Sequence, residues 1–519
     1  MKKISVVGAG PGGLTAAILL ANAGYEVEVF EKEGFIGGRT SPIHIGDFTF
    51  DRGPTFVNMM YLIKEIFDLA DRNLEDYVEL VELTPLYDLI YNTKRLTVTS
   101  DYEQMISNIE EVFPGNTAGY TRYLQETHKK LEALVPLLQK KMDSITDLLS
   151  IDAVKALPEL EIGKSLMQKL AEYFNDEELQ LAFTFQSKYL GMSPWSCPGA
   201  FSILSYIEQA YGVFHIKGGV NQLTQAMATV LEEMNVKIHL NTPVKEVLKT
   251  KKKVAGLLLE NGDIIYSDDV VINADFGYAM TKLLKEPLAS KWTPEKVKKK
   301  QFSCSTFMLY LGLDTQYDLQ HHTIMFAEDY KKNMEEISDT KILSEDMSIY
   351  IQNPVVSDST LAPAGKSTLY VLAPVPNNFS DIDWPQIKKQ YRDVLIKTLE
   401  SRLDLKDLEQ HIEEELVFSP QDWEQQMNVY QGATFNLGHQ LSQMMTFRPH
   451  NQFKPYQNCW LVGGGTHPGS GLPIILESSR ITANLILERD GIKTYPIQPL
   501  PKKVNYSIPK VPAYDPTTI

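Results

Sequence analysis

A glycine-rich turn near the N-terminus carries the clearest chemical signal in the sequence. Gly8, Gly10 and Gly13 form a GxGxxG pattern between an apolar run at 4–7 and a helical pattern over 14–23. The first glycine permits a tight turn, the second lets the backbone approach a pyrophosphate, and the third lets helix and strand pack closely. Free amides and the partial positive charge at the start of the helix favour phosphate. The pattern therefore predicts a dinucleotide-binding site.

An acidic residue follows this turn at the distance that such a site needs. Residues 25–30 alternate in a way that is typical of a strand, and Glu31 stands at the end of that strand. A carboxylate in this place accepts hydrogen bonds from ribose hydroxyls. We therefore expect Glu31, with its neighbour Lys32, to contact the cofactor. The alternative is a plain glycine turn with a glutamate that faces solvent.

A second group of glycines comes shortly after this acid. The sequence runs Gly37-Gly38-Arg39-Thr40, and the run 51–55 follows it. From Gly8 to Pro54 the chain resembles the superfamily of FAD-dependent amine oxidases and carotenoid desaturases. The resemblance implies an FAD cofactor whose diphosphate and ribityl chain lie along the second motif. The contacts that it implies beyond the first turn are Gly38, Arg39, Thr40, Gly53, Pro54, Thr55 and Val244. The alternatives are a plain loop at Gly37-Gly38 and, for Arg39, a surface ion pair, which contributes little.

A third motif lies near the C-terminus. Residues 461–473 read LVGGGTHPGSGLP, which is similar to the signature of the bacterial-type phytoene desaturases. Many flavoproteins place an acid after this strand, where this chain has glycines and a threonine, so backbone amides take over that role or it is left unfilled. A helix that begins at this motif would stabilise negative charge on the reduced flavin ring. The expected cofactor contacts are Gly464, Gly471, Leu472 and Pro473.

Further runs at 214–219, 302–305 and 361–366 are similar to the diapophytoene desaturase branch, and the similarity extends to about residue 490. The resemblance implies a carotenoid desaturase that introduces double bonds into an acyclic polyene, 4,4'-diapophytoene or phytoene, by hydride transfer from an allylic carbon to flavin N5. A hydrocarbon offers no polar handle, so its position must come from the shape of a long apolar tunnel. Neither a Ser-His-Asp set nor a metal cluster is needed, and we find neither in the sequence.

No residue is assigned as catalytic, but two are candidates. His467 lies beside the expected flavin site, where it either accepts a proton or fixes the loop through a backbone hydrogen bond. Arg448 precedes the last strand and either places a charge at the end of the tunnel or forms an ordinary ion pair.

Three other functions remain open. The first is a carotenoid terminal-methyl oxygenase on the same scaffold. The second is an FAD-dependent amine oxidase, which would place an aromatic cage around the flavin. The third is a flavoprotein that binds only lipid or a partner.

Composition limits the partners. The 519 residues carry a formal charge of −16, which excludes a nucleic-acid partner because phosphate neutralisation needs a basic surface. The three cysteines contain no CxxC pair and fit a reducing compartment. No apolar stretch is long enough to span a bilayer. We therefore expect a cytoplasmic enzyme, peripheral on the inner face of the cell membrane, with oxygen or a quinone as electron acceptor.

Two segments are candidates for the membrane contact. Segment 122–141 places leucines and a valine on one helical face, and its five basic residues outnumber its two acidic ones. The alternative is an amphipathic helix packed on its own domain. The lysine-rich stretch 291–300 is the second candidate.

The elements that position these motifs indicate an α/β fold. We expect an FAD-binding, Rossmann-like domain assembled from 1–100, 210–290 and 415–490, with a mixed α+β substrate domain built from the inserts 101–209 and 291–414. The tail, 491–519, is rich in proline and is expected to form an extended arm or a loose terminus.

Overall fold

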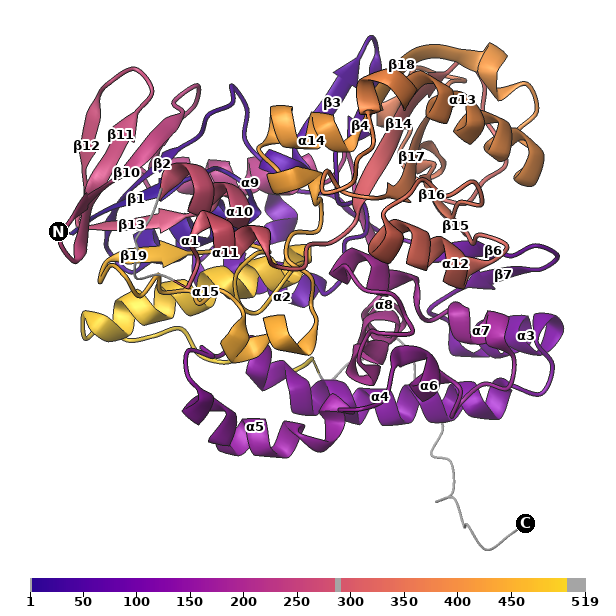
Figure 1. Cartoon of the computed structure of the whole chain (residues 1–519), viewed down its shortest axis with the longest axis horizontal. Coiled ribbons are helices and arrows are strands. Elements are labelled where there is room, and N and C mark those ends of the chain that lie inside the picture. The colour runs from indigo at the N-terminus through magenta and orange to yellow at the C-terminus, as the bar shows by residue number, and fades with distance from the viewer. Residues whose placement is uncertain (1, 285–290, 502–519) are drawn as a thin grey trace, which may run out of the picture.

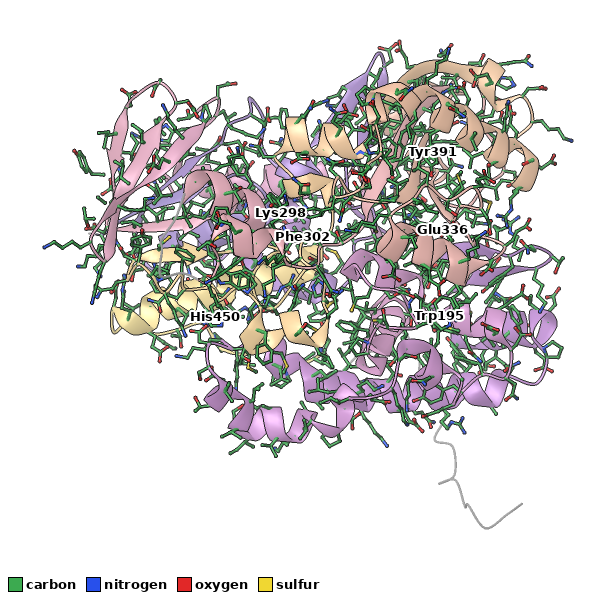
Figure 2. All side chains as sticks on the ribbon, in the orientation of Figure 1. Trp195, Lys298, Phe302, Glu336, Tyr391 and His450 are labelled. Carbon is green, nitrogen blue, oxygen red and sulfur yellow. The ribbon has the colours of Figure 1, made fainter. Side chains whose placement is uncertain are left out.

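The computed structural model describes residues 2–284 and 291–501. Two parts lie side by side in Figure 1, a nucleotide-binding part on the left and a part with a large sheet above a layer of helices on the right and below. In Figure 2, Tyr391 marks the helix Trp384–Arg402, which packs on the sheet of the second part, and Trp195 marks a turn in its helical region.

The nucleotide-binding part is built on a five-stranded parallel sheet. Its strand order is β19-β13-β1-β2-β9, with β1 (Lys3–Val7), β2 (Glu26–Phe30), β9 (Lys237–His239), β13 (Asp269–Ile272) and β19 (Cys459–Leu461). The helices α1 (Pro11–Asn22), α9 (Asn221–Glu233) and α15 (Leu472–Arg489) pack together beside it. Side chains of β1 are buried on both faces, as expected of a central parallel strand. The predicted fold class is confirmed.

An antiparallel sheet extends this part. It contains β10 (Val244–Thr250), β11 (Lys253–Leu259) and β12 (Ile264–Tyr266). The smaller elements are α2 (Met60–Leu69), α10 (Phe276–Tyr278), α11 (Pro294–Lys298), α14 (Pro420–Met427), β3 (Pro42–Ile45), β4 (Phe48–Asp51), β5 (Leu80–Glu82) and β8 (Phe214–Ile216).

The second part contains a seven-stranded sheet. Its order is β18-β14-β17-β16-β15-β6-β7, with β6 (Tyr87–Ile90), β7 (Arg95–Val98), β14 (Ser305–Leu313), β15 (His322–Met325), β16 (Ile349–Gln352), β17 (Ser367–Val375) and β18 (Ile412–Phe418). β6 and β7 fall inside the stretch 1–100 that the sequence places in the FAD domain, yet β6 pairs with β15 and β7 pairs with β6. The boundary at residue 100 therefore does not coincide with a change of sheet.

Alternating side chains of β14 face two different cores. Phe307, Leu309 and Leu311 pack with α13 (Trp384–Arg402) on one face of the sheet. Met308 and Tyr310 join the core shared with the helical layer on the other face. This alternation is the period of a strand buried on both sides.

The helical layer comprises α3 (Tyr102–Val112), α4 (Thr117–Leu138), α5 (Ile151–Ala156), α6 (Leu166–Leu170), α7 (Glu177–Leu181) and α8 (Ile203–Tyr211), while α12 (Tyr330–Glu335) lies near the sheet. None of the described helices is long and apolar enough to cross a bilayer. Residues 491–501 form an arm without helix or strand, in which Tyr495 donates to the Leu19 carbonyl at 2.6 Å. The remainder of the predicted tail, 502–519, lies outside the described residues.

Candidate functional site

The first glycine turn packs at backbone distance. Gly8 has a φ of +98°, and a Cβ on Gly13 would lie 2.0 Å from the Gly8 carbonyl oxygen. A side chain on Gly13 would therefore force α1 away from β1, as the GxGxxG pattern predicts. Gly10 differs, because a Cβ there would meet its nearest neighbour, the Asn273 amide, at 3.0 Å.

The second glycine motif faces the first. A Cβ on Gly38 would meet only the Gly10 Cα, at 3.6 Å, and Gly37 donates its amide to the Ala9 carbonyl at 2.9 Å. Thr40 closes this turn through its hydroxyl, which donates to the Gly37 carbonyl at 2.8 Å. The two turns thus present bare backbone to a common space, which is what a diphosphate requires.

The first turn of α1 offers amides to that space. Gly10 is the N-cap residue and Pro11 begins the helix. Within the described residues, no side chain caps this end. The free amides and the helix dipole are therefore available to an anion.

Glu31 lies at the end of β2, hydrogen-bonded to the first glycine turn. Its buried carboxylate accepts from the Ala9 amide at 2.8 Å and from the Glu33 amide at 3.0 Å, one bond to each oxygen. Each carboxylate oxygen has a further lone pair that can accept a ribose hydroxyl. Lys32 beside it donates to the Gln426 carbonyl at 2.9 Å. Val244 begins β10, two residues after Thr242, whose amide donates to the Glu31 carbonyl at 2.7 Å.

Arg39 joins distant segments of the chain. Its guanidinium pairs with Asp275 at 2.8 Å and donates to the Thr434 carbonyl at 2.5 Å. Burial raises the pKa of Asp275, and Arg39 opposes that shift. Asn436 donates to the same carboxylate at 2.9 Å. With a buried partner, this pair is more than the surface contact that the sequence left as an alternative.

Three tyrosines of the large sheet hold the loop 52–55. Tyr310 donates to the Arg52 carbonyl at 2.6 Å, and Tyr370 donates to the Gly53 carbonyl at 2.8 Å. The Tyr350 hydroxyl lies 2.6 Å from that of Thr55. Pro54 lies between these anchored residues. The second part of the protein thus fixes a predicted cofactor loop of the first.

The C-terminal motif places a helix end at the site. Gly471 is the N-cap of α15, with a φ of +110°, and a Cβ there would meet only Ile474, at 3.8 Å. Leu472 and Pro473, both buried, form the first helical residues. Ser479 on the same helix donates to the Gly12 carbonyl at 2.7 Å. The start of α15 therefore packs beside the first glycine turn.

Arg448 is fully buried among backbone carbonyls. Its guanidinium donates to the carbonyls of Leu437, Gly438, Gln443, Gly464 and Thr466, the shortest contact being 2.6 Å to Gly464. Burial lowers its pKa to about 9. The residue thus connects the loop 437–443 to the motif that contains Gly464, through hydrogen bonds rather than an ion pair.

His467 is also buried and reaches the end of α4. Its Nε2 lies 2.8 Å from the Lys140 carbonyl and must donate there. Burial lowers the pKa of this imidazole to about 4, so the ring is neutral at pH 7. This is the geometry of a loop-fixing contact. A catalytic role for either candidate stays a prediction.

Asn273 is a central residue that the sequence patterns did not single out. It follows β13, and its amide donates to the Gly8 carbonyl at 3.3 Å. The Cβ positions built on Gly12 and Gly463 also lie 2.8 and 3.3 Å from its amide oxygen. The signal was its place at the carboxyl end of a parallel strand beside β1, where ligands bind in open α/β sheets.

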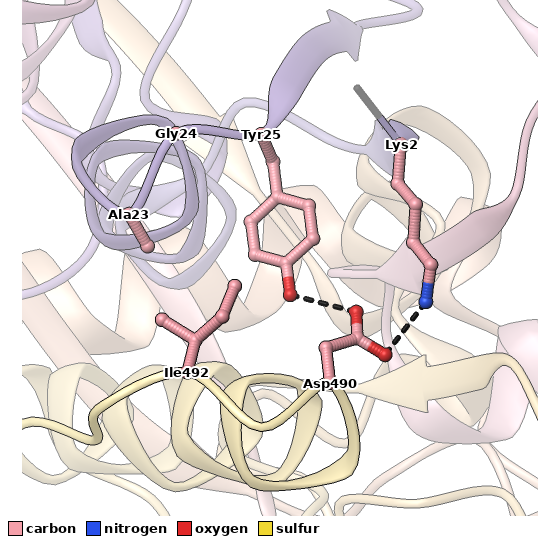
Figure 3. Close-up of a pocket in the computed structure, with 6 residues that line it drawn as sticks. All are labelled: Lys2, Ala23, Gly24, Tyr25, Asp490 and Ile492. Atoms are coloured by element: carbon pink, nitrogen blue, oxygen red, sulfur yellow. Dashed lines mark hydrogen bonds and ion pairs between the residues drawn. The ribbon is translucent and has the colours of Figure 1, made fainter.

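A surface pocket of about 340 Å³ lies away from this site (Figure 3). Tyr25 and Lys2 both bind Asp490 there, at 2.7 and 2.6 Å. The pocket is at the C-terminal end of α1, whose 12 residues span about 18 Å from the glycine turn. It belongs to the packing of α1 against α15.

The parallel sheet, the two glycine turns and the buried acid define a class of protein, a two-part α/β protein with the features of a flavoenzyme. The model of the family described as flavin containing amine oxidoreductase matches residues 11–487. The chain belongs to that family and, within it, to the diapophytoene desaturase branch, and it is a flavin-dependent oxidoreductase.

The relatives named in this branch come from two bacteria. A 4,4'-diapophytoene desaturase (4,4'-diapolycopene-forming) from Methylomonas sp is 48% identical over 492 residues, covering 95% of this chain and 96% of the relative. A 4,4'-diapophytoene desaturase (4,4'-diaponeurosporene-forming) from Staphylococcus aureus strain Newman is 34% identical over 497 residues, covering 94% and 99%.

Solved structures share the fold at low identity. An oxidoreductase from Methanosarcina mazei superimposes with a TM-score of 0.61 at 18% identity, covering 94% of this chain and 100% of that one. A putrescine oxidase bound to putrescine gives a TM-score of 0.57 at 14% identity, covering 94% and 99%. These likenesses support the fold alone.

Proposed function

We propose that the flavin is FAD and that the enzyme desaturates 4,4'-diapophytoene in carotenoid biosynthesis. The choice of FAD as cofactor rests on the buried carboxylate of Glu31, which lies at the end of β2 and is hydrogen-bonded to the glycine turn. That place suits the ribose of an adenosine, which FAD has and FMN lacks. The similarity to two desaturases along nearly the whole chain supports the reaction.

The residues present fit FAD. Gly10, Gly38 and the start of α1 would hold the diphosphate, and Glu31 the ribose. The open start of α15 at Gly471 would lie at the isoalloxazine. FAD, when bound, supplies a two-electron acceptor. The helix end favours the negative charge that reduction brings, and the loop 52–55 is fixed by the sheet of the substrate domain.

The substrate would lie between the two parts, held by shape. Desaturation removes a hydride and a proton from neighbouring carbons, so the protein must orient a chain with no polar group. The core shared by the large sheet and the helical layer is rich in aromatic rings, for example Phe56, which stacks on His322 at 4.1 Å between ring centres. Aromatic side chains at this place suit contact with a polyene.

An anaerobic half-reaction tests this function. Holoenzyme mixed with 4,4'-diapophytoene in detergent should lose flavin absorbance in one turnover, and the product should be lighter by two hydrogens. Bleaching by putrescine instead would favour amine oxidation. A product that forms only with oxygen and contains it would favour the terminal-methyl oxygenase.

We further propose a cytoplasmic location on the inner membrane face, because the substrate is a hydrocarbon that dissolves in lipid. The electron acceptor is oxygen or a quinone. Reoxidation of the reduced holoenzyme by each, measured separately, decides between them.

A further inference from the structure

One surface of the helical layer exposes large aliphatic side chains in an unusual concentration. Six of them, each between 55% and 75% exposed, lie within the segment 145–162, namely Ile145, Leu149, Ile151, Val154, Leu157 and Ile162. The other exposed large apolar residues of the described chain are spread over more than 250 positions, from Leu240 to Ile497. Single exposed leucines are ordinary, but a contiguous group marks a site of contact.

The segment is ordered by local contacts. It consists of three short helical pieces, Ile145–Leu149, Ile151–Ala156 and Pro158–Leu160. Ser150 caps the second piece by accepting from the Ala153 amide at 3.3 Å. Ala153 and Ala156 are buried, and Leu148 and Leu160 pack partly against the core of the helical layer. The other six large aliphatic side chains of the segment are left exposed.

Three of the four acidic groups of the segment are engaged within the protein. Asp147 accepts from the amides of Asp143 and Ser144, both at 2.8 Å. Asp152 pairs with Lys140, and Glu161 pairs with Lys130 at 2.9 Å. Two of the four carboxylates of the segment are therefore paired with lysines.

Lysines gather where the segment begins. Lys454 donates to the Asp143 carbonyl at 2.8 Å, and His450, labelled in Figure 2, lies 3.7 Å from the Asp143 carboxylate. Lys291 and Lys300 both stand over the ring of Trp292, at 5.1 and 5.2 Å. Burial lowers the pKa of Lys291, and the neighbouring charges of Lys454 and Lys300 add to that shift.

Segment 122–141, the contact expected from the sequence, does not have a free apolar face. Leu124, Leu131 and Leu134 are buried in the core of the helical layer. Lys130, counted as a surface charge, is 1% exposed and paired with Glu161. The helix α4 instead supports the exposed segment, because α5 packs against it at the lower edge of the molecule in Figure 1.

We propose that residues 145–162 insert into the apolar layer of a bilayer that contains anionic phospholipids, with Lys291, Lys300 and Lys454 contacting the phosphates. The inference rests on the proposed function, because a hydrocarbon substrate is stored in lipid. Apolar side chains beside a cluster of lysines match the layered chemistry of a membrane surface. A second copy of this chain would not require the lysines.

Flotation of the holoenzyme with vesicles of phosphatidylcholine and phosphatidylglycerol tests this surface. The triple variant Leu149→Ser, Ile151→Ser, Leu157→Ser should lower the partition coefficient at least tenfold. The matched control, Ile264→Ser, Ile342→Ser, Val356→Ser, changes exposed residues elsewhere and should bind as the unaltered enzyme does. Equal flavin content and circular dichroism spectra show that each variant is folded.

Three further outcomes are decisive. The variant Lys291→Glu, Lys300→Glu, Lys454→Glu should lose the preference for phosphatidylglycerol but keep binding to pure phosphatidylcholine. Binding of the 149/151/157 triple at the unaltered level would overturn the proposal. So would a dimer in solution that this triple dissociates, since the segment would then be a contact between copies.

A second assay separates the proposed membrane contact from the proposed desaturase activity. With substrate in detergent micelles, the 149/151/157 triple should desaturate at the unaltered rate, since these three side chains are exposed and are not among the residues proposed to hold the cofactor. If the unaltered holoenzyme does not desaturate in micelles, the proposed function fails, whatever flotation gives.

Discussion

Replacing Glu31 with alanine should weaken FAD binding by a predictable amount. The carboxylate accepts hydrogen bonds from the amides of Ala9 and Glu33 and, in the proposed complex, from the hydroxyls of the adenosine ribose. A hydrogen bond to a charged group contributes about 1.5–3 kcal/mol. With tenfold for each 1.4 kcal/mol, the dissociation constant should rise roughly 10- to 150-fold.

The assay is titration of the apoprotein with FAD, followed by quenching of flavin fluorescence. FMN is an internal control, because it lacks the adenosine ribose, so its affinity should be the same in the unaltered protein and in Glu31→Ala. Glu33→Ala is the matched control variant, since it keeps the backbone amide that binds Glu31 and removes only a side chain paired with Lys32.

Two results would refute this reasoning. An unchanged FAD affinity in Glu31→Ala would show that the carboxylate does not bind ribose. An equal loss of FAD and FMN affinity would show that the substitution distorts the glycine turn through Ala9 instead.

Three other perturbations have defined outcomes. Gly471→Leu should keep FAD but abolish turnover, because leucine would fill the open space at the start of α15 and is disfavoured at a φ of +110°. Flavin content and the initial rate measure the two effects, and a normal rate would contradict the prediction. Tyr370→Phe should lower the free energy of unfolding by about 1 kcal/mol through the lost bond to the Gly53 carbonyl, measured by urea denaturation. His467 has a pKa lowered to about 4 in the folded protein, against an ordinary 6.5, so the unfolded chain takes up the proton at a higher pH than the folded chain does. As the pH drops from 6.5 to 4, the free energy of unfolding should therefore fall by about 1.4 kcal/mol per pH unit. His467→Gln should remove this contribution from the pH dependence of stability.

The cofactor motifs could be predicted because they depend on local backbone constraints. Gly8, with its positive φ, and Gly13, with its 2.0 Å approach to a carbonyl, tolerate no other residue, so they show in the sequence. The start of α1 was predicted late. The helix begins at Pro11 and not at residue 14, because proline is favoured in the first turn of a helix. The helix expected at the C-terminal motif does begin there, at Leu472.

Contacts between distant segments could not be predicted in this way. Nothing in the pattern around residues 87–98 specifies pairing with β15, and nothing in Tyr370 specifies Gly53 as its partner. The sequence pattern of an apolar helical face is the same whether the face contacts lipid or packs on the protein's own core. For that reason α4 was a candidate for the membrane contact. Segment 145–162 was missed because its three short pieces share no helical period.

The order of strands in the parallel sheet has a consequence for biosynthesis. β13 and β19 are neighbours, yet Ile272 and Cys459 are separated by most of the substrate domain. At roughly 5–20 residues per second, the ribosome needs on the order of 10–40 s to supply the missing strand. During that time one edge of β13 has unpaired backbone groups. Chaperones cover such edges, which at high protein concentration can pair with strands of other chains. Assembly of the flavin cradle is therefore a late event, completed only when α15 docks against the first glycine turn.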